Sequence, residues 1–161
     1  MSLVIRAAAD GDVNALVALM SSFYAEAKLT LSAAAATRAF SALIATPQLG
    51  AVWLAELDAE PVGHIVLAAV FSMEYGGLRG FIDDFYVKPA ARGRGIGAAL
   101  LAAARDGAKA RGLRALCVET GLADHPARSL YARAGYVDTE HALLVQPLAA
   151  PMHDQSGDSI R

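Results

Sequence analysis

The first third of the chain carries its apolar residues at the spacing of amphipathic helices. Between residues 12 and 27 they recur every three or four positions, so one helix face is apolar. These residues are Val13, Leu16, Val17, Met20, Phe23 and Tyr24. Asp10 or Asp12 is the expected N-cap. A second helical pattern begins at about Ser32 and stops before Pro47. The pattern therefore predicts two consecutive helices, each burying one face.

Runs of apolar, β-branched and aromatic residues predict the strands. They cover residues 3–5, 52–57, 62–73, 80–87 and 113–120, and turn sequences make the middle three a meander. The run LRALCVET is typical of a strand buried on both faces. Two further helices are predicted, one over residues 96–110 and one between Pro126 and Gly135. The last extended segments are expected at residues 136–137 and 142–148.

The order of these elements, β-αα-βββ-α-β-α-β(β), predicts the fold class. An antiparallel meander followed by a crossover gives an α/β (α+β) fold with a mixed central sheet and helices on both faces. Neither a doubly wound parallel sheet nor a pure sandwich has this order. A chain of 161 residues suits one domain. We expect that domain over residues 1–148 and a polar tail over residues 149–161.

Composition and charge narrow the class of protein. Apolar runs are too short for a spanning helix, and the N-terminus has no export-signal pattern. The lone Cys117 fits a reducing compartment, and a net charge of −2 gives no attraction to nucleic acid. We therefore expect a cytoplasmic protein without a membrane or nucleic-acid partner. The histidines do not have the spacing of metal ligands, so no metal is expected: His64, His125, His141 and His153.

The candidate chemistry lies in residues 80–103, GFIDDFYVKPAARGRGIGAALLAA. An acidic strand leads into a loop of glycines and arginines, and an apolar helix follows. Free N–H groups at a helix N-terminus bind anions, and glycines let a phosphate approach the backbone. The stretch is therefore interpreted as a phosphate-binding loop with carboxylates upstream.

This loop also allows two other interpretations. Gly93-x-Gly95-x-x-Ala98, with Glu119 about twenty residues later, matches a permissive dinucleotide-binding pattern. That pattern belongs at the first strand–helix turn of a parallel fold, whereas here three antiparallel strands precede it. The P-loop pattern GxxxxGK followed by Ser or Thr is absent. The simplest alternative is an ordinary loop with solvated arginines.

Two motifs resemble those of the GCN5-related N-acetyltransferases (GNAT). Arg92-x-x-Gly95-x-Gly97, preceded by an acidic strand ending in Tyr-Val-x-Pro, is similar to the acyl-CoA signature of that family. Ala127-x-x-Leu130-Tyr131-x-x-x-Gly135-Tyr136 resembles the downstream helix of the family. The resemblance covers roughly residues 3–148 and implies an acetyl-CoA-dependent N-acetyltransferase. A homodimer is a further expectation from the family.

The resemblance implies where acetyl-CoA binds. Its pyrophosphate is expected on the loop and helix N-terminus: Arg92, Gly93, Arg94, Gly95, Ile96, Gly97 and Ala98. Its pantetheine is expected along the strand end Phe85, Tyr86 and Val87. Ala127 and Leu130 belong to the second motif. Asp124 stands where the family often has Asn, which puts a usual contact to the CoA arm in doubt.

The resemblance also implies catalytic roles. An attacking amine must lose a proton, and a carboxylate is a suitable base. Asp83 and Asp84 are adjacent, so strand alternation places them on opposite faces. We favour Asp83, because its position matches an acid in polyamine-acetylating members. The alternative for either acid is an ion pair with Arg79 or Arg92. Tyr131 is expected to protonate the departing thiolate, or else to be a core residue beside Leu130.

The acceptor side is less well specified. Tyr24, Glu26, Glu74, Asp84 and Glu119 are candidate substrate-binding residues. Acids with aromatic side chains suit a cationic amine, although Phe23 and Tyr24 also fit a core. We expect direct transfer in a ternary complex to a small primary amine such as a polyamine, an amino acid or an aminoglycoside-like molecule. The alternatives are a protein N-terminus or lysine as acceptor, and a non-catalytic acyl-CoA sensor.

Overall fold

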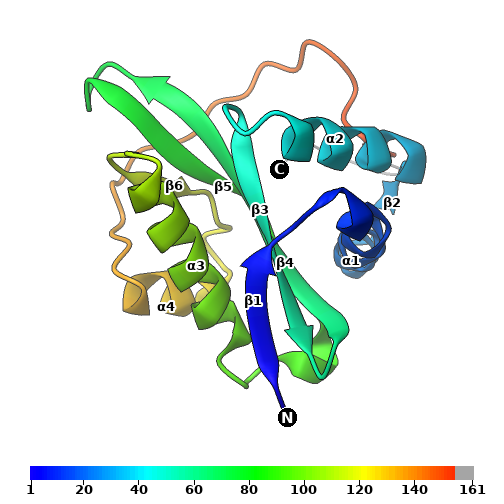
Figure 1. Ribbon diagram of the computed structural model, residues 1–161. Coiled ribbons are helices and arrows are strands. Elements are labelled where there is room, and N and C mark those ends of the chain that lie inside the picture. Colours follow the sequence, from blue (N-terminus) through cyan, green and yellow to red (C-terminus); the bar gives the residue numbers. More distant parts are fainter. Residues whose placement is uncertain (155–161) are drawn as a thin grey trace.

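A computed structural model of the chain describes residues 1–154. A five-stranded sheet in the order β1–β3–β4–β5–β6 lies at its centre, with helices on both faces (Figure 1). The strands are β1 (Leu3–Ala7), β3 (Gly50–Leu57), β4 (Glu60–Ser72), β5 (Gly77–Val87) and β6 (Leu116–Val118). The first four pair antiparallel and β6 pairs parallel to β5. The predicted mixed α/β fold is therefore confirmed.

Each face of the sheet has its own apolar core. On one face pack α3 (Ile96–Ala110) and α4 (His125–Arg133), where Leu100 and Ala104 of α3 are fully buried against Ile65 and Leu67 of β4. On the other face pack α1 (Val13–Glu26) and α2 (Ala33–Ala45), with Leu16 and Phe40 in the same cluster as Leu54. The two cores hold α1 and α3 on opposite sides of β5.

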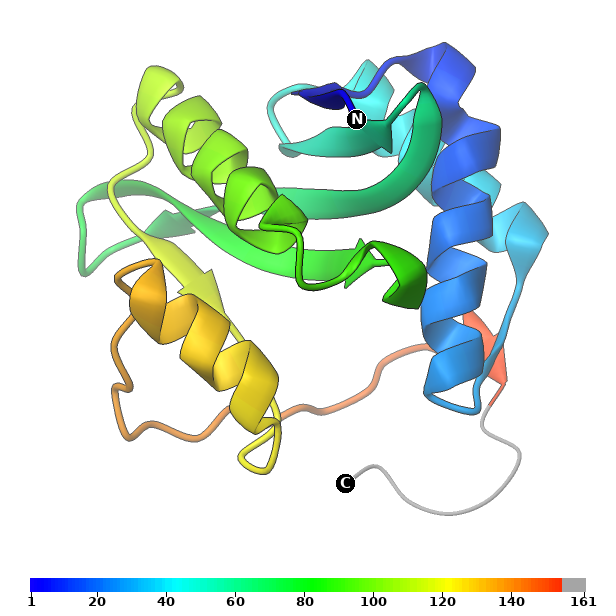
Figure 2. The same cartoon turned by 90° about the horizontal axis from the view of Figure 1, so that it is seen from below.

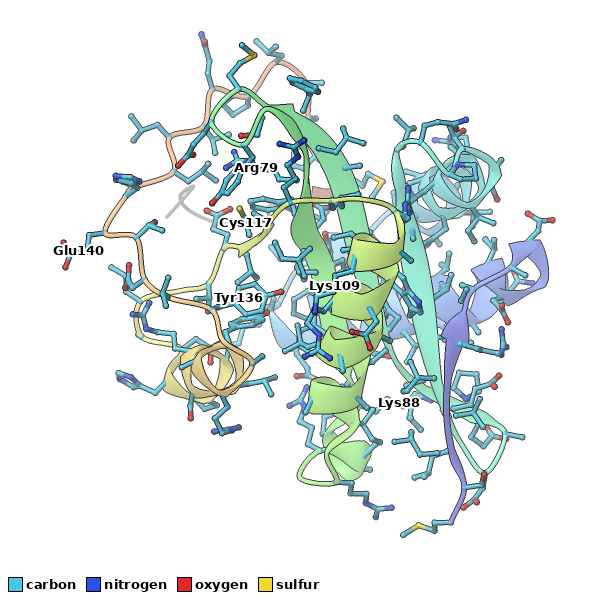
Figure 3. All side chains as sticks on the ribbon, turned by 60° about the vertical axis from the view of Figure 1, so that its left-hand side comes forward. Arg79, Lys88, Lys109, Cys117, Tyr136 and Glu140 are labelled. Atoms are coloured by element: carbon cyan, nitrogen blue, oxygen red, sulfur yellow. The ribbon has the colours of Figure 1, made fainter. Side chains whose placement is uncertain are left out.

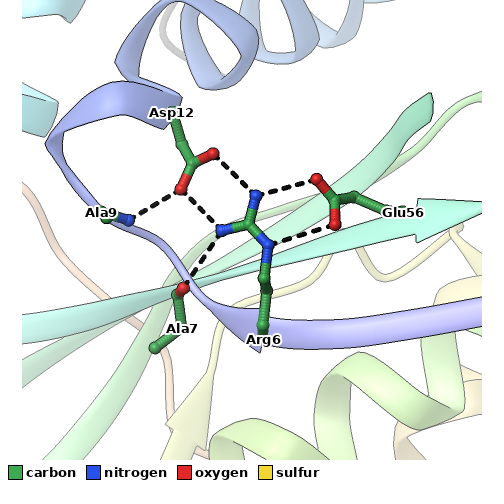
Figure 4. Close-up of polar contacts among 5 residues, drawn as sticks. All are labelled: Arg6, Ala7, Ala9, Asp12 and Glu56. Carbon is green, nitrogen blue, oxygen red and sulfur yellow. Dashed lines mark hydrogen bonds and ion pairs between the residues drawn. The ribbon is translucent and has the colours of Figure 1, made fainter. Parts of the chain in front are cut away.

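An ion-pair network fixes the start of α1 to the sheet (Figure 4). The Arg6 guanidinium on β1 donates to both carboxylate oxygens of Asp12, each at 2.8 Å, and also to Glu56 on β3. Asp12 in addition accepts a bond from the Ala9 N–H. The hydrogen bonds from Arg6 hold the pKa of Asp12 at about 2, below its ordinary value.

The fifth strand is shorter than the sequence predicts. Residues 113–120 were expected as a strand buried on both faces, but β6 spans only Leu116–Val118 and is half-buried. Among the described residues it pairs with β5 alone, at the edge of the sheet. An apolar run favours a strand but does not supply a second neighbour, so the prediction of a fully buried strand is wrong.

The expected final strands are also absent from the described residues. Residues 136–137 and 142–148 form no strand, and Leu144 is 90% exposed. Figure 2 shows this segment running from α4 to the far end of α1, where β7 (His153–Asp154) pairs with β2 (Thr30–Leu31). The predicted tail thus contains a short strand, and its residues 155–161 lie outside the described residues.

Candidate active site

The glycine-rich loop joins β5 to the N-terminus of α3. Gly95 is the N-cap residue and has a φ of +78°, in the left-handed region that favours glycine. No side chain caps this helix end, so its first N–H groups are left for an external acceptor. A Cβ on Gly97 would lie 3.3 Å from Leu130 Cδ2 and 3.4 Å from Phe85 Cζ. Glycine at this position therefore lets α3 pack closely on β5 and α4.

The two loop arginines have different surroundings. The Arg92 guanidinium lies over the Tyr86 ring and donates to the Val87 carbonyl and to Glu26 Oε2, both at 2.8 Å. It therefore ties the loop to the C-terminal end of α1. Arg94 is exposed, with Nη1 3.2 Å from the Met1 Sδ. The backbone of the loop, rather than the Arg92 side chain, is the part left open for an anion.

The sheet opens beside this loop. β6 pairs with β5 only from Gly80 to Ile82, and the end of β5 continues without it. A hollow of about 370 Å³ lies at the point of separation. Its lining comes from β5 and from the residues after β6: Phe81, Ile82, Asp83, Glu119, Thr120 and Gly121. The opening therefore exposes a strand edge next to two carboxylates.

A β-bulge lies in β5 at the two aspartates. Val66 of β4 pairs with Asp84 and the next residue pairs with Ile82, so Asp83 is the extra residue. Ile82 and Phe85, three positions apart, consequently pack in the same core. The pKa of Tyr24 on α1 is raised, mainly by burial and then by the charges of Asp84 and Asp83. Alternation fails across a bulge, so it no longer places the two aspartates on opposite faces.

The two aspartates nevertheless have different environments. Asp83 is exposed at the mouth of the hollow, yet desolvation by the surrounding protein, and then the charge of Asp84, raise its pKa. Asp84 is buried and its Oδ2 lies 3.0 Å from Nε2 of the fully buried His64. Neither aspartate forms a recorded ion pair with Arg79 or Arg92.

Tyr131 and Tyr136 lie on the α3 and α4 face. The Tyr131 ring is 6.3 Å from the Phe85 ring and 5.6 Å from the Tyr136 ring. Figure 3 shows Tyr136 between α4 and α3, with Cys117 nearby on β6. Burial is the main cause that raises the pKa of Tyr131 to about 12. Tyr131 therefore keeps its proton at neutral pH. It belongs to the core and also lies next to the end of β5.

The second motif forms the start of α4. The Asp124 Oδ1 accepts a hydrogen bond from the Ala127 N–H at 3.1 Å, so this aspartate caps the helix. Leu130 packs in the core beside Gly97. The aspartate that departs from the usual asparagine thus has a structural role in the chain itself.

The C-terminal half of α1 faces the end of β5. Phe23 packs on Tyr86, with 5.6 Å between ring centroids, and Tyr24 is half-buried. The Tyr86 hydroxyl donates to Glu26 Oε1 at 2.6 Å, and Arg92 occupies Oε2. Both oxygens of Glu26 therefore have protein partners, and the carboxylate acts as a clamp between α1 and β5. Phe23 is half-buried and packs against the apolar core on the α1 face.

Glu74 does not join the other candidates. It is exposed in the turn between β4 and β5, at the end of the hairpin away from the loop (Figure 1). At ~3.3 Å per residue, the tip lies roughly 25–30 Å from Asp83 along β5. The expectation that Glu74 forms the acceptor wall with Tyr24 fails, because the long hairpin carries it outward.

Sequence reasoning missed two histidines. The place of His64 inside an apolar run of residues is a usable signal, because a polar side chain there is expected to be buried and to need a partner. His153 was placed in the tail, yet its ring lies 5.5 Å from the Tyr24 ring, because β7 pairs with β2 and the Ser32 N–H bonds the Met152 carbonyl. No local pattern in residues 149–154 predicts that pairing.

Residues 1–154 contain no group of three or more His, Cys, Asp or Glu side chains placed to hold a metal ion. Within the same residues, no helix has the length and apolarity to cross a membrane.

Comparisons with known proteins agree with this geometry. An integron cassette protein from the mobile metagenome of Cole Harbour Salt Marsh has 51% identity and a TM-score of 0.85, over 92% of each chain. The uncharacterized N-acetyltransferase YhfO of Bacillus subtilis (strain 168) is 35% identical over 85 residues, 53% of this chain and 57% of that protein. An IAA acetyltransferase of Azospirillum brasilense is 35% identical over 82 residues, which are 51% of this chain and 54% of that protein. The chain spans about half the length of the curated relatives it matches.

The family comparison covers most of the site. The model of the Acetyltransferase (GNAT) family matches residues 14–136, which include α1, the bulge, the glycine-rich loop and α4. The chain belongs to the GNAT family of acetyltransferases.

Proposed function

We propose that this protein transfers the acetyl group of acetyl-CoA to a small primary amine, directly within a ternary complex. The observation that carries the proposal is the opening between β5 and β6, which places an exposed strand edge and Asp83 beside the glycine-rich loop. A predicted acetyltransferase of the same fold from Clostridium acetobutylicum, 22% identical with a TM-score of 0.76, was crystallised with acetyl-CoA. At that identity the likeness concerns the fold.

The donor side fits the anionic and extended parts of acetyl-CoA. The uncapped N-terminus of α3 and the open space around Gly93 and Gly95 suit a pyrophosphate. The free edge of β5 after Ile82 suits the amide groups of a pantetheine chain, which hydrogen-bond as a strand does. A β5 N–H would also polarise the thioester carbonyl.

The two ends of the reaction fall to Asp83 and Tyr131. Asp83 takes the proton of the amine, directly or through water, because its raised pKa brings it closer to neutrality. The amine nitrogen forms a bond to the acetyl carbon, and the bond from that carbon to sulfur breaks. Tyr131, protonated at neutral pH, donates its proton to the departing thiolate.

The amine class follows from charge on the acceptor side. Asp83 and Glu119 line the opening, and Asp84 adjoins Asp83 in the bulge. Tyr24 of α1 is close enough to both aspartates for their charges to raise its pKa, in addition to burial. Carboxylates with an aromatic ring suit a cationic substrate. Polyamines, amino acids and aminoglycoside-like amines share this chemistry and form the panel to test.

The test follows free thiol as acetyl-CoA is consumed in the presence of each amine. Thiol release that depends on one class of amine, with the acetylated product found by mass spectrometry, supports the proposal. Tight CoA binding without turnover on any amine or peptide would contradict it and favour a non-catalytic acyl-CoA sensor.

A further inference from the structure

A buried histidine–aspartate pair lies behind the proposed acceptor side of the site. The proposed reaction gives no role to the histidine. His64 of β4 and Asp84 of β5 are 0% and 7% exposed, and 3.0 Å separates Nε2 from Oδ2. The His64 ring meets Phe40 of α2 edge-on, with 6.0 Å between ring centroids. The imidazole is thus held between the sheet and α2 and has one orientation toward Asp84.

Stability does not account for this pair. Apolar residues of similar volume can replace a buried ion pair without loss of stability, and often with a gain. Buried polar atoms are ordinarily hydrogen-bonded, yet Asp84 Oδ1 and His64 Nδ1 have no partner among the described residues. Both atoms are also closed to solvent, so the Asp84 carboxylate holds its charge where water screens it little.

The surroundings of Asp84 indicate the kind of ligand on which its charge acts. It adjoins Asp83 in the bulge, and Asp83 lines the hollow where β5 and β6 separate. Its charge also reaches the half-buried Tyr24 on α1. Asp84 is therefore the innermost of the carboxylates around the opening. A cationic amine in the hollow meets Asp83, and the adjacent charge of Asp84 adds to the attraction.

We propose that His64 is a positioning residue for the acceptor amine. Its Nε2–H fixes Asp84 Oδ2 and so holds the charge of Asp84 next to Asp83, where that charge attracts the incoming ammonium group while Asp83 takes the proton. The inference rests on the proposed function and deepens its acceptor side. It requires the His64 proton on Nε2, since only a donor at that atom can hold the carboxylate.

Three substitutions of His64 test whether an N–H donor is needed and whether it must reach Asp84. His64→Gln keeps an amide N–H near the place of Nε2, His64→Asn carries the same amide too short to reach, and His64→Leu removes the donor. We expect Asn and Leu to raise the KM for the amine about 10- to 100-fold, the loss typical of a hydrogen bond to a charged group. The Gln variant is expected within about threefold of wild type, and the KM for acetyl-CoA unchanged in all three.

A double-substitution cycle tests whether His64 acts through Asp84. If it does, adding His64→Leu to Asp84→Asn raises the amine KM no further than Asp84→Asn alone. Independent, multiplicative effects in the cycle, or an amine KM in the Asn variant equal to that of wild type, overturn the inference. CoA binding by each variant serves as the check on folding.

The same experiments distinguish the inference from the function beneath it. A wild-type protein that binds CoA but acetylates no amine overturns the proposed function, and the role of Asp84 with it. An active wild type whose amine KM does not respond to His64 overturns the positioning role alone. Histidine side-chain NMR adds a readout without turnover, because a His64 proton found only on Nδ1 contradicts the proposal.

Discussion

The proposed donor side and the proposed acceptor side of this site are built in different ways. The donor side is one continuous piece of chain: the end of β5, the loop and the N-terminus of α3. The proposed acceptor side is assembled from several elements. They are α1, β4, the bulge of β5, the residues after β6 and the antiparallel pair of β2 with β7. Conformation of a continuous piece follows from its own residues, whereas an assembled wall depends on distant anchors. Substitutions on the two sides should therefore affect different kinetic constants.

Asp83→Asn is the strongest test of the acceptor side. A general base contributes about 100- to 10,000-fold, so we expect kcat with the best amine to fall by that factor while CoA binding stays unchanged. Stopped-flow thiol release and calorimetric titration with CoA give the two values. Glu119→Gln, on the same hollow, is the matched control and should change the amine KM rather than kcat. Equal kcat in Asp83→Asn and wild type would show that another group is the base.

The pH profile sharpens the assignment of Asp83. The proposed base is its carboxylate form, and burial and then the charge of Asp84 raise its pKa above the ordinary value. Activity is therefore expected to fall, as pH decreases, at a higher pH than for a solvated aspartate. Asp84→Asn removes the neighbouring charge, so the acid limb of kcat/KM should move to lower pH. A limb that stays in place in this variant argues against coupling between the two aspartates.

Tyr131→Phe tests the point where the two sides meet. Removing the hydroxyl leaves water to protonate the thiolate, so we expect kcat to fall about 100-fold at an unchanged KM for acetyl-CoA. Tyr136→Phe is the control, because it removes a buried hydroxyl of the same cluster that has no described partner. If both variants keep wild-type kcat, Tyr131 belongs to the core only.

The contrast between the two sides also explains what could be predicted from the sequence. The helix over Ile96–Ala110 and the glycine loop were predicted correctly, because glycine conformation and helix ends follow local rules. The bulge was not, since one extra residue in β5 is defined only by its pairing with β4. The neighbours of the two histidines are distant in the sequence. Asp84 lies 20 residues after His64, and Tyr24 lies in the first helix whereas His153 lies near the end of the described residues. The outward displacement of Glu74 follows from hairpin length, which the turn sequence alone does not convey.

Gly97→Val should break the donor side alone. Its side chain would meet Leu130 and Phe85, where a Cβ already lies at 3.3 and 3.4 Å, and α3 must move off β5. We expect the Kd for CoA to rise about tenfold, the effect of about 1.4 kcal/mol, with the amine KM at saturating acetyl-CoA unchanged. Calorimetry measures the first value and thiol release the second. Gly93→Ala, which meets nothing within 4 Å but has a φ of +75°, separates backbone strain from the clash. A rise in amine KM equal to that in Kd would mean that the two sides are not independent.

The smallest effect is expected where α1 is anchored to the sheet, far from the reaction. Asp12→Asn keeps an oxygen for the Ala9 N–H but loses its charge opposite Arg6. Because the pair is partly exposed, we expect the free energy of unfolding at pH 7 to fall by no more than about 1 kcal/mol. The pKa of Asp12 is about 2 when folded and 3.8 ordinarily, so its contribution is complete above pH 3.8 and lost as pH falls through 2. Urea unfolding at pH 7, 5, 3 and 2 should therefore show wild type and variant converging at the lowest pH. Asp106→Asn, in the exposed pair with Arg105, should show no such difference at any pH. A gap that persists at pH 2 would mean that Asp12 stabilises α1 by something other than its charge.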